Sequence, residues 1–480
     1  MPAKSRTANY KSRTLSSGSL AGLLVLISGA LCTLEPAPAH AQTWAAMRVQ
    51  EPPIPIPPKP NQKTGGTVAP RKGRETLDLN SDWRFRVDAK GVGELEQWEK
   101  RVPDGVPLLR IPYHWKSGSQ PEAGWFWRQI EIPKKWKGQT ARLIFGAVSG
   151  KALFWFDGQS IGKHDGGTTP FEFNVTQLFK PGGKHLVAVR IEGEKRANVG
   201  ISDGVQLVSH DEAYLQRIFV RASGLGNLEA EIQIRNLGPN SGSSTLIAKI
   251  VSPDQPKREL KQTEQNLSIT PELNLTTLLT SLKKKQFILW TLDIPALYRF
   301  DLSFRQDLDI LDTTETIFGF REFGWKAGRI TLNGVPITPS ASRLDDAIPE
   351  IFTTDADRVQ ALALLRKSKE SGKNLIYLHA PTPPLLQLGD SEGLFYVEGA
   401  RPGLSESERF SELQNLIFRD RSHPSILAWD IRRLSEAQAT KLRTLDSTRF
   451  FLSENSKSPL LYPPGSDEGV ALPAGFLLEK

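Results

Sequence analysis

RDRSHPSILAWDIRRLSE, residues 419–436, is the stretch that decides how the C-terminal part of this chain folds. Pro424 disfavours a helical conformation for the residue before it, so the preceding residues are expected to end a loop. The next four residues, Ile426-Leu427-Ala428-Trp429, form a continuous apolar run of the kind that parallel strands show. The stretch therefore predicts a short buried strand that follows a loop.

Helical and strand patterns alternate on both sides of this strand. Residues 355–371 are predicted to form a helix with one broad apolar face, made by Val359, Leu362, Leu364 and Leu365. Helices are also expected at 406–419 and 436–444, strands at 374–381, 394–399 and 445–454, and a helix or turn at 383–393. This order indicates parallel βα units.

Residues 76–211 are expected to form a β-sandwich. Apolar segments such as ARLIF (141–145), ALFWF (152–156) and HLVAVRI (185–191) are separated by Gly and Pro punctuation. Asp157-Gly158 suits a tight hairpin that needs positive φ. Four tryptophans at strand spacing are predicted to lie in the core, although they are also candidates for sugar-stacking platforms: Trp83, Trp125, Trp127 and Trp155.

Residues 212–325 form a second all-β block. NLEAEIQIRNL (227–237) and STLIAKIVS (244–252) alternate apolar and polar residues, as half-buried strands do. A block of about a hundred residues is the length of an immunoglobulin-like sandwich.

The N-terminus is typical of a secretory signal peptide, residues 1–41. Basic residues precede an apolar segment, Leu20 to Leu34, and Ala39-His40-Ala41 forms a cleavage site that ends at Ala41. The apolar segment is short for a stable membrane span, with an uncleaved anchor as the alternative. The protein is therefore expected to be secreted or periplasmic. Residues 42–75, which include EPPIPIPPKP (51–60), are predicted to be a Pro-rich linker.

Cysteine use and charge exclude several classes of site. The single cysteine, Cys32, lies inside the predicted signal peptide, so the mature chain would have no disulfide and no thiolate metal site. We expect neither a metal nor another cofactor. The net charge of +8 falls to about +5 without the signal peptide, and only Lys283–Lys285 forms a basic run, which is expected to be a solvated turn. Nucleic acid is therefore not an expected partner.

Motifs in both β blocks and in the C-terminal part resemble one family, glycoside hydrolase family 2, which includes β-galactosidases, β-glucuronidases and β-mannosidases. The matching segments are LNSDWRFRVD (79–88), GWFWRQIEIPKKWKG (124–138), residues 145–176, GISDGVQLV (200–208), WTLDIPALYRFDLSF (290–304), IFGFREF (317–323) and HPSILAW (423–429). The resemblance implies a galactose-binding-like jelly roll, an immunoglobulin-like sandwich and, at 326–480, a partial (β/α)8 TIM barrel.

The resemblance also implies where the catalytic residues of the family would lie. The family places an Asn-Glu pair after the fourth barrel strand, and the Glu is the general acid/base; this chain has Arg433 and Leu434 there. The nucleophile belongs to a seventh strand, but a full barrel takes about 250 residues and the sequence after Asn333 is much shorter. The Arg of the family's second strand is replaced by Tyr377. The catalytic pair is therefore expected to be absent.

Several residues near this expected site remain candidates. Asp430 and Glu436 are possible substitutes for the missing acid, although Ser435 can cap a helix that begins at Glu436. His379, Trp429 and Glu398 match family positions and are candidate substrate-binding residues. Asp390 and Gly393 match the family's Asp-x-x-Gly, for which helix termination is the favoured interpretation.

We interpret the chain as a carbohydrate-binding or partner-binding scaffold that has lost glycosidase activity. The alternatives are an active O-glycosyl hydrolase with displaced carboxylates and a purely structural envelope scaffold. Because unpaired sheet edges invite association, a homodimer or a partner subunit is expected to cover the open half-barrel.

Overall fold

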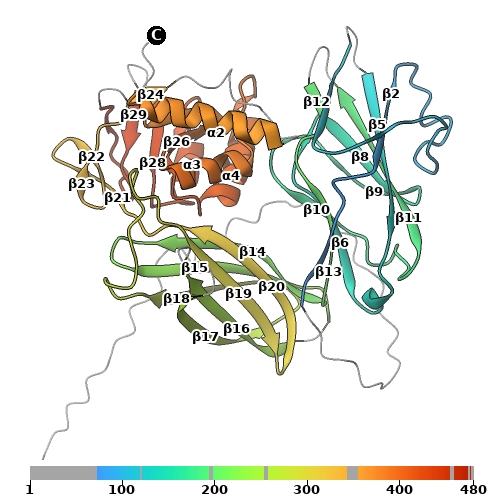
Figure 1. The fold of residues 1–480 in the computed structure, drawn as a ribbon, viewed down its shortest axis with the longest axis horizontal. Coiled ribbons are helices and arrows are strands. Elements are labelled where there is room, and N and C mark those ends of the chain that lie inside the picture. The colour runs from blue at the N-terminus through green and yellow to red at the C-terminus, as the bar shows by residue number, and fades with distance from the viewer. Residues whose placement is uncertain are drawn as a thin grey trace, which may run out of the picture. The chain divides into compact units, whose positions relative to one another are not determined.

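The computed structural model describes residues 73–118, 122–193, 198–239, 241–252, 258–342, 355–454, 459–473 and 476. The predicted signal peptide and nearly all of the predicted linker lie outside these residues. Figure 1 shows two regions of strands and one region in which helices alternate with strands.

The first region is built from antiparallel sheets that enclose one core. The four-stranded sheet has the order β1 (Glu75–Asp78), β13 (Val205–His210), β6 (Thr140–Phe145) and β10 (Phe171–Asn174). The six-stranded sheet has the order β3 (Leu108–Leu109), β2 (Trp83–Asp88), β5 (Glu122–Glu131), β11 (Lys184–Gly193), β8 (Lys151–Phe156) and β9 (Gln159–His164). A small sheet joins β4 (Tyr113–Lys116), β12 (Asn198–Ile201) and β7 (Val148–Ser149), and Lys134–Trp136 forms a 3-10 turn. Phe145 from one large sheet and Phe154 from the other belong to the same core, as the predicted sandwich requires.

Three of the tryptophans are buried as predicted, but in two apolar clusters: Trp83 lies in the sandwich core, whereas Trp125 and Trp127 pack with Trp98 on the other face of the six-stranded sheet. Trp83, Trp125 and Trp127 are at most 1% exposed, so they cannot serve as sugar platforms. Trp155 is half-buried and stacks on Trp125 with 5.3 Å between ring centroids. The predicted hairpin also holds, because Asp157 and Gly158 both have positive φ, at 50° and 76°.

The second region is a two-sheet β structure. One sheet has the order β14 (Ala213–Ala222), β15 (Asn227–Asn236) and β18 (Glu272–Ser281), and the other has the order β17 (Glu259–Ile269), β16 (Gly242–Val251), β19 (Tyr298–Gln306) and β20 (Asp309–Phe318). The predicted alternation is observed in β15, where every second residue is buried. These residues meet others from β16 and β19 in a single core. Lys283–Lys285 is an exposed turn, as expected.

The third region is a curled half-barrel sheet. A small sheet of β21 (Phe323–Lys326), β22 (Arg329–Leu332) and β23 (Val335–Pro336) leads into it. The parallel strands of the half-barrel sheet are β24 (Ala341–Ser342), β25 (Leu375–His379), β26 (Phe395–Gly399), β27 (Ile426–Asp430) and β28 (Phe450–Glu454). The helices α2 (Asp355–Glu370), α3 (Pro383–Glu392), α4 (Glu406–Asp420) and α5 (Glu436–Arg443) alternate with these strands. In Figure 1, α2, α3 and α4 lie over one side of this sheet.

The sheet continues beyond β28 in the opposite direction. β29 (Pro459–Tyr462) pairs antiparallel with β28, and β30 (Val470–Ala471) pairs antiparallel with β29. The place next to β28, where another parallel strand would lie, is therefore taken by a hairpin strand. We expected a second copy or a partner subunit to cover the open half-barrel, but the edge at β28 is paired with β29 of the same chain.

Phe476 closes the apolar interior of the half-barrel. Its side chain is fully buried in a cluster with Tyr377, Val397 and Leu452, which come from three of the parallel strands. The hydroxyl of Tyr377 donates a hydrogen bond to the Phe476 carbonyl at 3.0 Å. The replaced position of the second strand thus serves packing.

The apolar face predicted for α2 is wrong in part. Val359 is 65% exposed, whereas Ala361, Leu365 and Ser368 form the buried stripe. These three positions are spaced i, i+4 and i+7, which is one helical face. Leu365 and two small residues thus form the buried face of α2, and Val359 lies outside it.

Candidate functional site

A pocket of about 250 Å³ opens at the carboxyl ends of the parallel strands. His379 ends β25, Asp430 ends β27 and Glu454 ends β28, so three strands direct their last side chains to one place. Pro402, Arg409, Arg432 and Arg433 complete the lining. This end of the strands is where βα sheets hold their ligands, because the loops that follow the strands converge there. We call this pocket the mouth.

His379 is the predicted binding residue that reaches the mouth. Its ring is exposed, and Nδ1 lies 3.1 Å from the carbonyl oxygen of Ala400. That contact fixes the ring at Nδ1 and leaves Nε2 for a ligand.

Trp429 belongs to a buried network on the other side of the strand. Its ring is fully buried, and Nε1 donates to the Asp446 carboxylate at 3.0 Å. Asp446 also accepts from Arg449 at 2.7 Å. Burial alone would raise the pKa of Asp446, but the Arg449 charge and the hydrogen bonds from Thr448 and Trp429 lower it to about 2. Trp429 therefore holds the barrel strands together and does not line the mouth.

Glu398 is also buried, and it does not line the mouth. Nη2 of Arg419 stays 3.8 Å from its carboxylate, while the same guanidinium binds Asp420 at 2.5–2.9 Å. Burial and the nearby charge of Asp420 raise the pKa of Glu398 well above its ordinary value. This burial away from the mouth gives Glu398 a structural place in the arrangement.

The two replaced catalytic positions lie on the turn that follows β27. Arg433 has a positive φ of 65°, and its backbone N–H donates to the Glu454 carboxylate at 3.0 Å. Its exposed side chain lines the mouth. Leu434 is half-buried beside it and carries no titratable group.

The acids that face the mouth are Asp430 and Glu454. Asp430 is held by Arg432, which donates from Nε at 2.9 Å and from Nη2 at 2.6 Å. The sequence pattern pointed to Asp430 but not to Glu454. The sequence did contain a signal for Glu454. Side chains alternate between the two faces of a strand, so Glu454 lies on the same face as Leu452, and Leu452 pairs with Asp430.

Glu436, the other proposed substitute, does not line the mouth. It begins α5, as expected, and its exposed carboxylate accepts from Arg443 at 2.5 Å. The predicted side-chain cap by Ser435 is absent: that hydroxyl makes no capping bond, and the Ser435 N–H donates to Glu406 at 2.8 Å instead.

The HPS motif is explained by contacts with α3. Asp390 accepts from His423 Nδ1 at 2.5 Å and from the backbone N–H of Ser425 at 3.0 Å. Burial alone would lower the pKa of His423, but the Asp390 carboxylate raises it. Gly393 ends α3 with φ of 66°, which confirms the helix-terminating interpretation of Asp-x-x-Gly.

A larger groove of about 1,370 Å³ adjoins the mouth and shares Pro402 with it. Its walls come from strands and loops of the first β region, from α4 and from the loop before α4, and they include Asp165, Asn198, Glu412 and Asn415. Such side chains donate and accept hydrogen bonds, as sugar hydroxyls require. Within the described ranges, no group of three or more His, Cys, Asp or Glu side chains could hold a metal ion. No helix in the same ranges is long and apolar enough to cross a membrane.

Two family sequence models match the chain. The model described as "Glycosyl hydrolases family 2, sugar binding domain" matches residues 118–225, and "Glycosyl hydrolases family 2" matches residues 213–321. A β-galactosidase of Thermoanaerobacter pseudethanolicus is 23% identical over 75% of this chain and 52% of its own length. A β-glucuronidase of Formosa agariphila is 23% identical over 79% of this chain and 44% of its own length. The chain thus spans about half the length of the curated relatives that it matches.

Solved structures show the same fold. A glycosyl hydrolase family 2 member from Bacteroides cellulosilyticus superposes with a TM-score of 0.68 at 21% identity, over 79% of this chain and 57% of that one. A Bacteroides uniformis β-glucuronidase superposes with a TM-score of 0.66 at 20% identity, over 79% of this chain and 52% of that one.

Proposed function

Because the chain belongs to glycoside hydrolase family 2, we propose that it binds carbohydrate at the mouth without hydrolysing it. The observation that carries this proposal is the turn after β27, where the positions of the family's Asn-Glu pair hold Arg433 and Leu434. A retaining glycosidase needs one carboxyl group to protonate the leaving oxygen and a second one about 5–5.5 Å away as the nucleophile. Leu434 has no proton to give.

The remaining acids of the mouth are engaged in ways that disfavour catalysis. Asp430 is neutralised by two hydrogen bonds from Arg432, and Glu454 accepts from the Arg433 backbone. The Arg432 guanidinium occupies the Asp430 carboxylate, so this carboxylate is not free to approach a leaving oxygen. The antiparallel strand β29 beside β28 also supports the proposal, because it takes the place of a further parallel strand.

The charge of the mouth favours an acidic sugar as the ligand. Arg409, Arg432 and Arg433 face it together with His379, against two carboxylates. Arg409 is only 7% exposed, and no ion pair holds it among the described residues. A guanidinium binds a carboxylate or a sulfate in a bidentate manner, so a uronic acid or a sulfated sugar would supply the missing counter-charge.

A second candidate function is hydrolysis by Asp430 and Glu454, since both carboxylates line one pocket from adjacent strands. In that case a ligand would have to displace Arg432 from Asp430.

We predict that aryl β-galactoside, β-glucoside, β-mannoside and β-glucuronide show no turnover above the level of the Asp430→Asn/Glu454→Gln double variant. The measurement is release of the aryl group by the purified protein, with Glu436→Gln as a control that changes an acid outside the mouth. Turnover that is lost in the double variant and kept in the control would establish the hydrolase and refute the binding proposal. Absence of both turnover and glycan binding would leave the purely structural scaffold.

The wider setting of the protein is also a proposal. The signal-like residues 1–41 support export to the periplasm or the medium. The strands β24 to β28 with their helices are proposed to be the first five strands of a TIM barrel. We further propose that a second copy or a partner subunit covers the edge at β24, which among the described residues pairs only with β25.

A further inference from the structure

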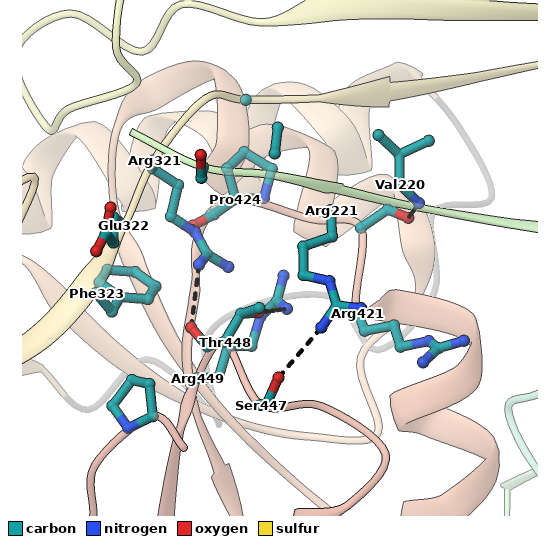
Figure 2. A pocket seen from close by; sticks show the side chains of 15 residues that line it. Val220, Arg221, Arg321, Glu322, Phe323, Arg421, Pro424, Ser447, Thr448 and Arg449 are labelled. Atoms are coloured by element: carbon teal, nitrogen blue, oxygen red, sulfur yellow. Dashed lines mark hydrogen bonds between the residues drawn. The ribbon is translucent and has the colours of Figure 1, made fainter. Parts of the chain in front are cut away.

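A second pocket, of about 290 Å³, lies at the opposite ends of the parallel strands from the mouth. Residues that precede β27 and β28 form one wall, and residues of β14 and of the segment after β20 form the other. Figure 2 shows that arginines from three of these segments enter it: Arg221, Arg321 and Arg449. Its size is near the lower end of small-molecule sites, which span about 300–1,000 Å³. We call it the arginine pocket.

Arg321 is a buried cation whose charge has no carboxylate partner among the described residues. It is 6% exposed, and it donates to two main-chain carbonyl oxygens, those of Pro424 and Thr448, both at 3.2 Å. Its guanidinium carbon lies 4.2 Å from the centre of the Phe323 ring. Burial and the charge of Arg449 lower the pKa of Arg321 well below its ordinary value. A buried guanidinium without a counter-charge is costly, so an anion would be stabilising here.

The other two guanidinium groups are held in place by acids that do not line the pocket. Arg449 is paired with Asp446 at 2.7 Å, and Arg221 is paired with Glu229 at 2.9 Å. These ion pairs fix both side chains, and Figure 2 shows the head of Arg449 next to that of Arg321 and the head of Arg221 farther along, above Ser447. Arg421, by contrast, points away from this group in Figure 2. Three fixed guanidinium groups and one carboxylate, that of Glu322, therefore line one small pocket, in which the positive charges outnumber the negative one.

Two serine hydroxyls in the pocket have a proton to donate. Ser422 Oγ accepts from the backbone N–H of Val220 at 3.2 Å, and Ser447 Oγ accepts from Arg221 at 3.1 Å. A hydroxyl that already accepts a hydrogen bond has its own O–H for another acceptor. Thr448 differs, since its hydroxyl donates to Asp446 at 2.6 Å. The pocket thus combines guanidinium groups with hydroxyl donors and needs an acceptor-rich, negatively charged ligand.

We propose that the arginine pocket binds a tetrahedral oxyanion, phosphate or sulfate, either as a free ion or as an ester group on a sugar. The site is separate from the mouth and does not depend on the proposed function there. The bound anion joins residues of the second β region to the half-barrel, so it stabilises the fold as well as filling a site.

The test is titration of the purified protein with inorganic phosphate and with sulfate at constant ionic strength. We expect saturable heat in calorimetry and a saturable rise in Tm, because a ligand that binds only the folded state stabilises it. The variant Ser422→Ala/Ser447→Ala should bind each anion about tenfold more weakly or worse, since hydrogen bonds to charged groups are worth roughly 1.5–3 kcal/mol. Its Tm without anion serves as the check on folding.

Two controls locate the effect. Lys284→Met and Arg329→Met each remove an exposed charge outside both pockets, so both should bind phosphate like the unaltered protein. Galactose 6-sulfate that binds more tightly than inorganic sulfate, and loses this advantage in the double serine variant, would identify a sugar ester as the ligand of the arginine pocket. Equal or weaker binding, or an advantage that the double serine variant keeps, would identify the free ion. The proposal is overturned by unchanged affinity in the double serine variant, by equal stabilisation with chloride, or by absence of saturable anion binding.

Discussion

Phe476→Ala is expected to lower the free energy of unfolding by about 3–5 kcal/mol, as for other fully buried phenylalanines. The ring is completely buried among residues of β25 to β29, including Tyr377 and Leu461. Truncation leaves a cavity in the interior of the half-barrel, which the curled sheet cannot collapse to fill. Among the described residues after β28, no other aromatic ring belongs to this cluster. The substitution therefore removes the ring that covers the interior of the half-barrel.

Urea unfolding followed by tryptophan fluorescence measures this loss. Leu308→Ala is the matched control, because Leu308 is 94% exposed and its truncation should change the stability by less than about 0.5 kcal/mol. A loss below about 1 kcal/mol for Phe476→Ala would mean that the ring does not occupy the interior.

Asp446→Asn is expected to cost about 3–5 kcal/mol, because it leaves a buried guanidinium without its carboxylate. Asp446 and Arg449 are each 2% exposed and lie 2.7 Å apart. Asn at this position still accepts from Trp429, but it no longer balances the charge of Arg449. The repulsion between two neighbouring cations, Arg321 and Arg449, would then lose the compensating charge of Asp446.

The pH dependence of the free energy of unfolding distinguishes loss of the Asp446–Arg449 ion pair from a packing defect. The pKa of Asp446 is lowered to about 2, so its stabilising effect is present above the ordinary value near 4 and is lost as the pH falls toward 2. The shift corresponds to about 2 kcal/mol. The difference in unfolding free energy between the unaltered protein and Asp446→Asn should therefore narrow below about pH 4, as measured by unfolding at a series of pH values. Asp307→Asn, an exposed turn position, should show no gap, and a pH-independent gap for Asp446→Asn would contradict the assignment.

Local sequence signals predicted most of the secondary structure. The apolar run 426–429 is part of β27, and Gly393 ends α3, because both depend on short-range chemistry. The buried face of α2 was partly misjudged, since only Leu365 of its three most buried residues is large and apolar, and Ala361 and Ser368 give no such signal. The reversal of direction after β28 was also missed, because strand pairing is decided by tertiary contacts.

The candidate site was harder to predict than the fold. His379 and Asp430 were identified and do line the mouth, but Trp429 and Glu398 are buried away from it. Arg409 and Glu454 were not identified, because a helix and a distant strand bring them there only in the folded chain. Arg321 was likewise part of a family motif in the sequence. Only the folded structure shows that its guanidinium is buried against main-chain carbonyl oxygens.

The most direct test of binding without hydrolysis is a calorimetric titration with an aryl β-glucuronide, with release of the aryl group followed in the same samples. We predict saturable binding, no release, and affinity that is weakened about tenfold in Arg409→Met, because a charged hydrogen bond is lost. Release of the aryl group, or no binding of this probe or of any sulfated sugar by the unaltered protein, would contradict the proposal.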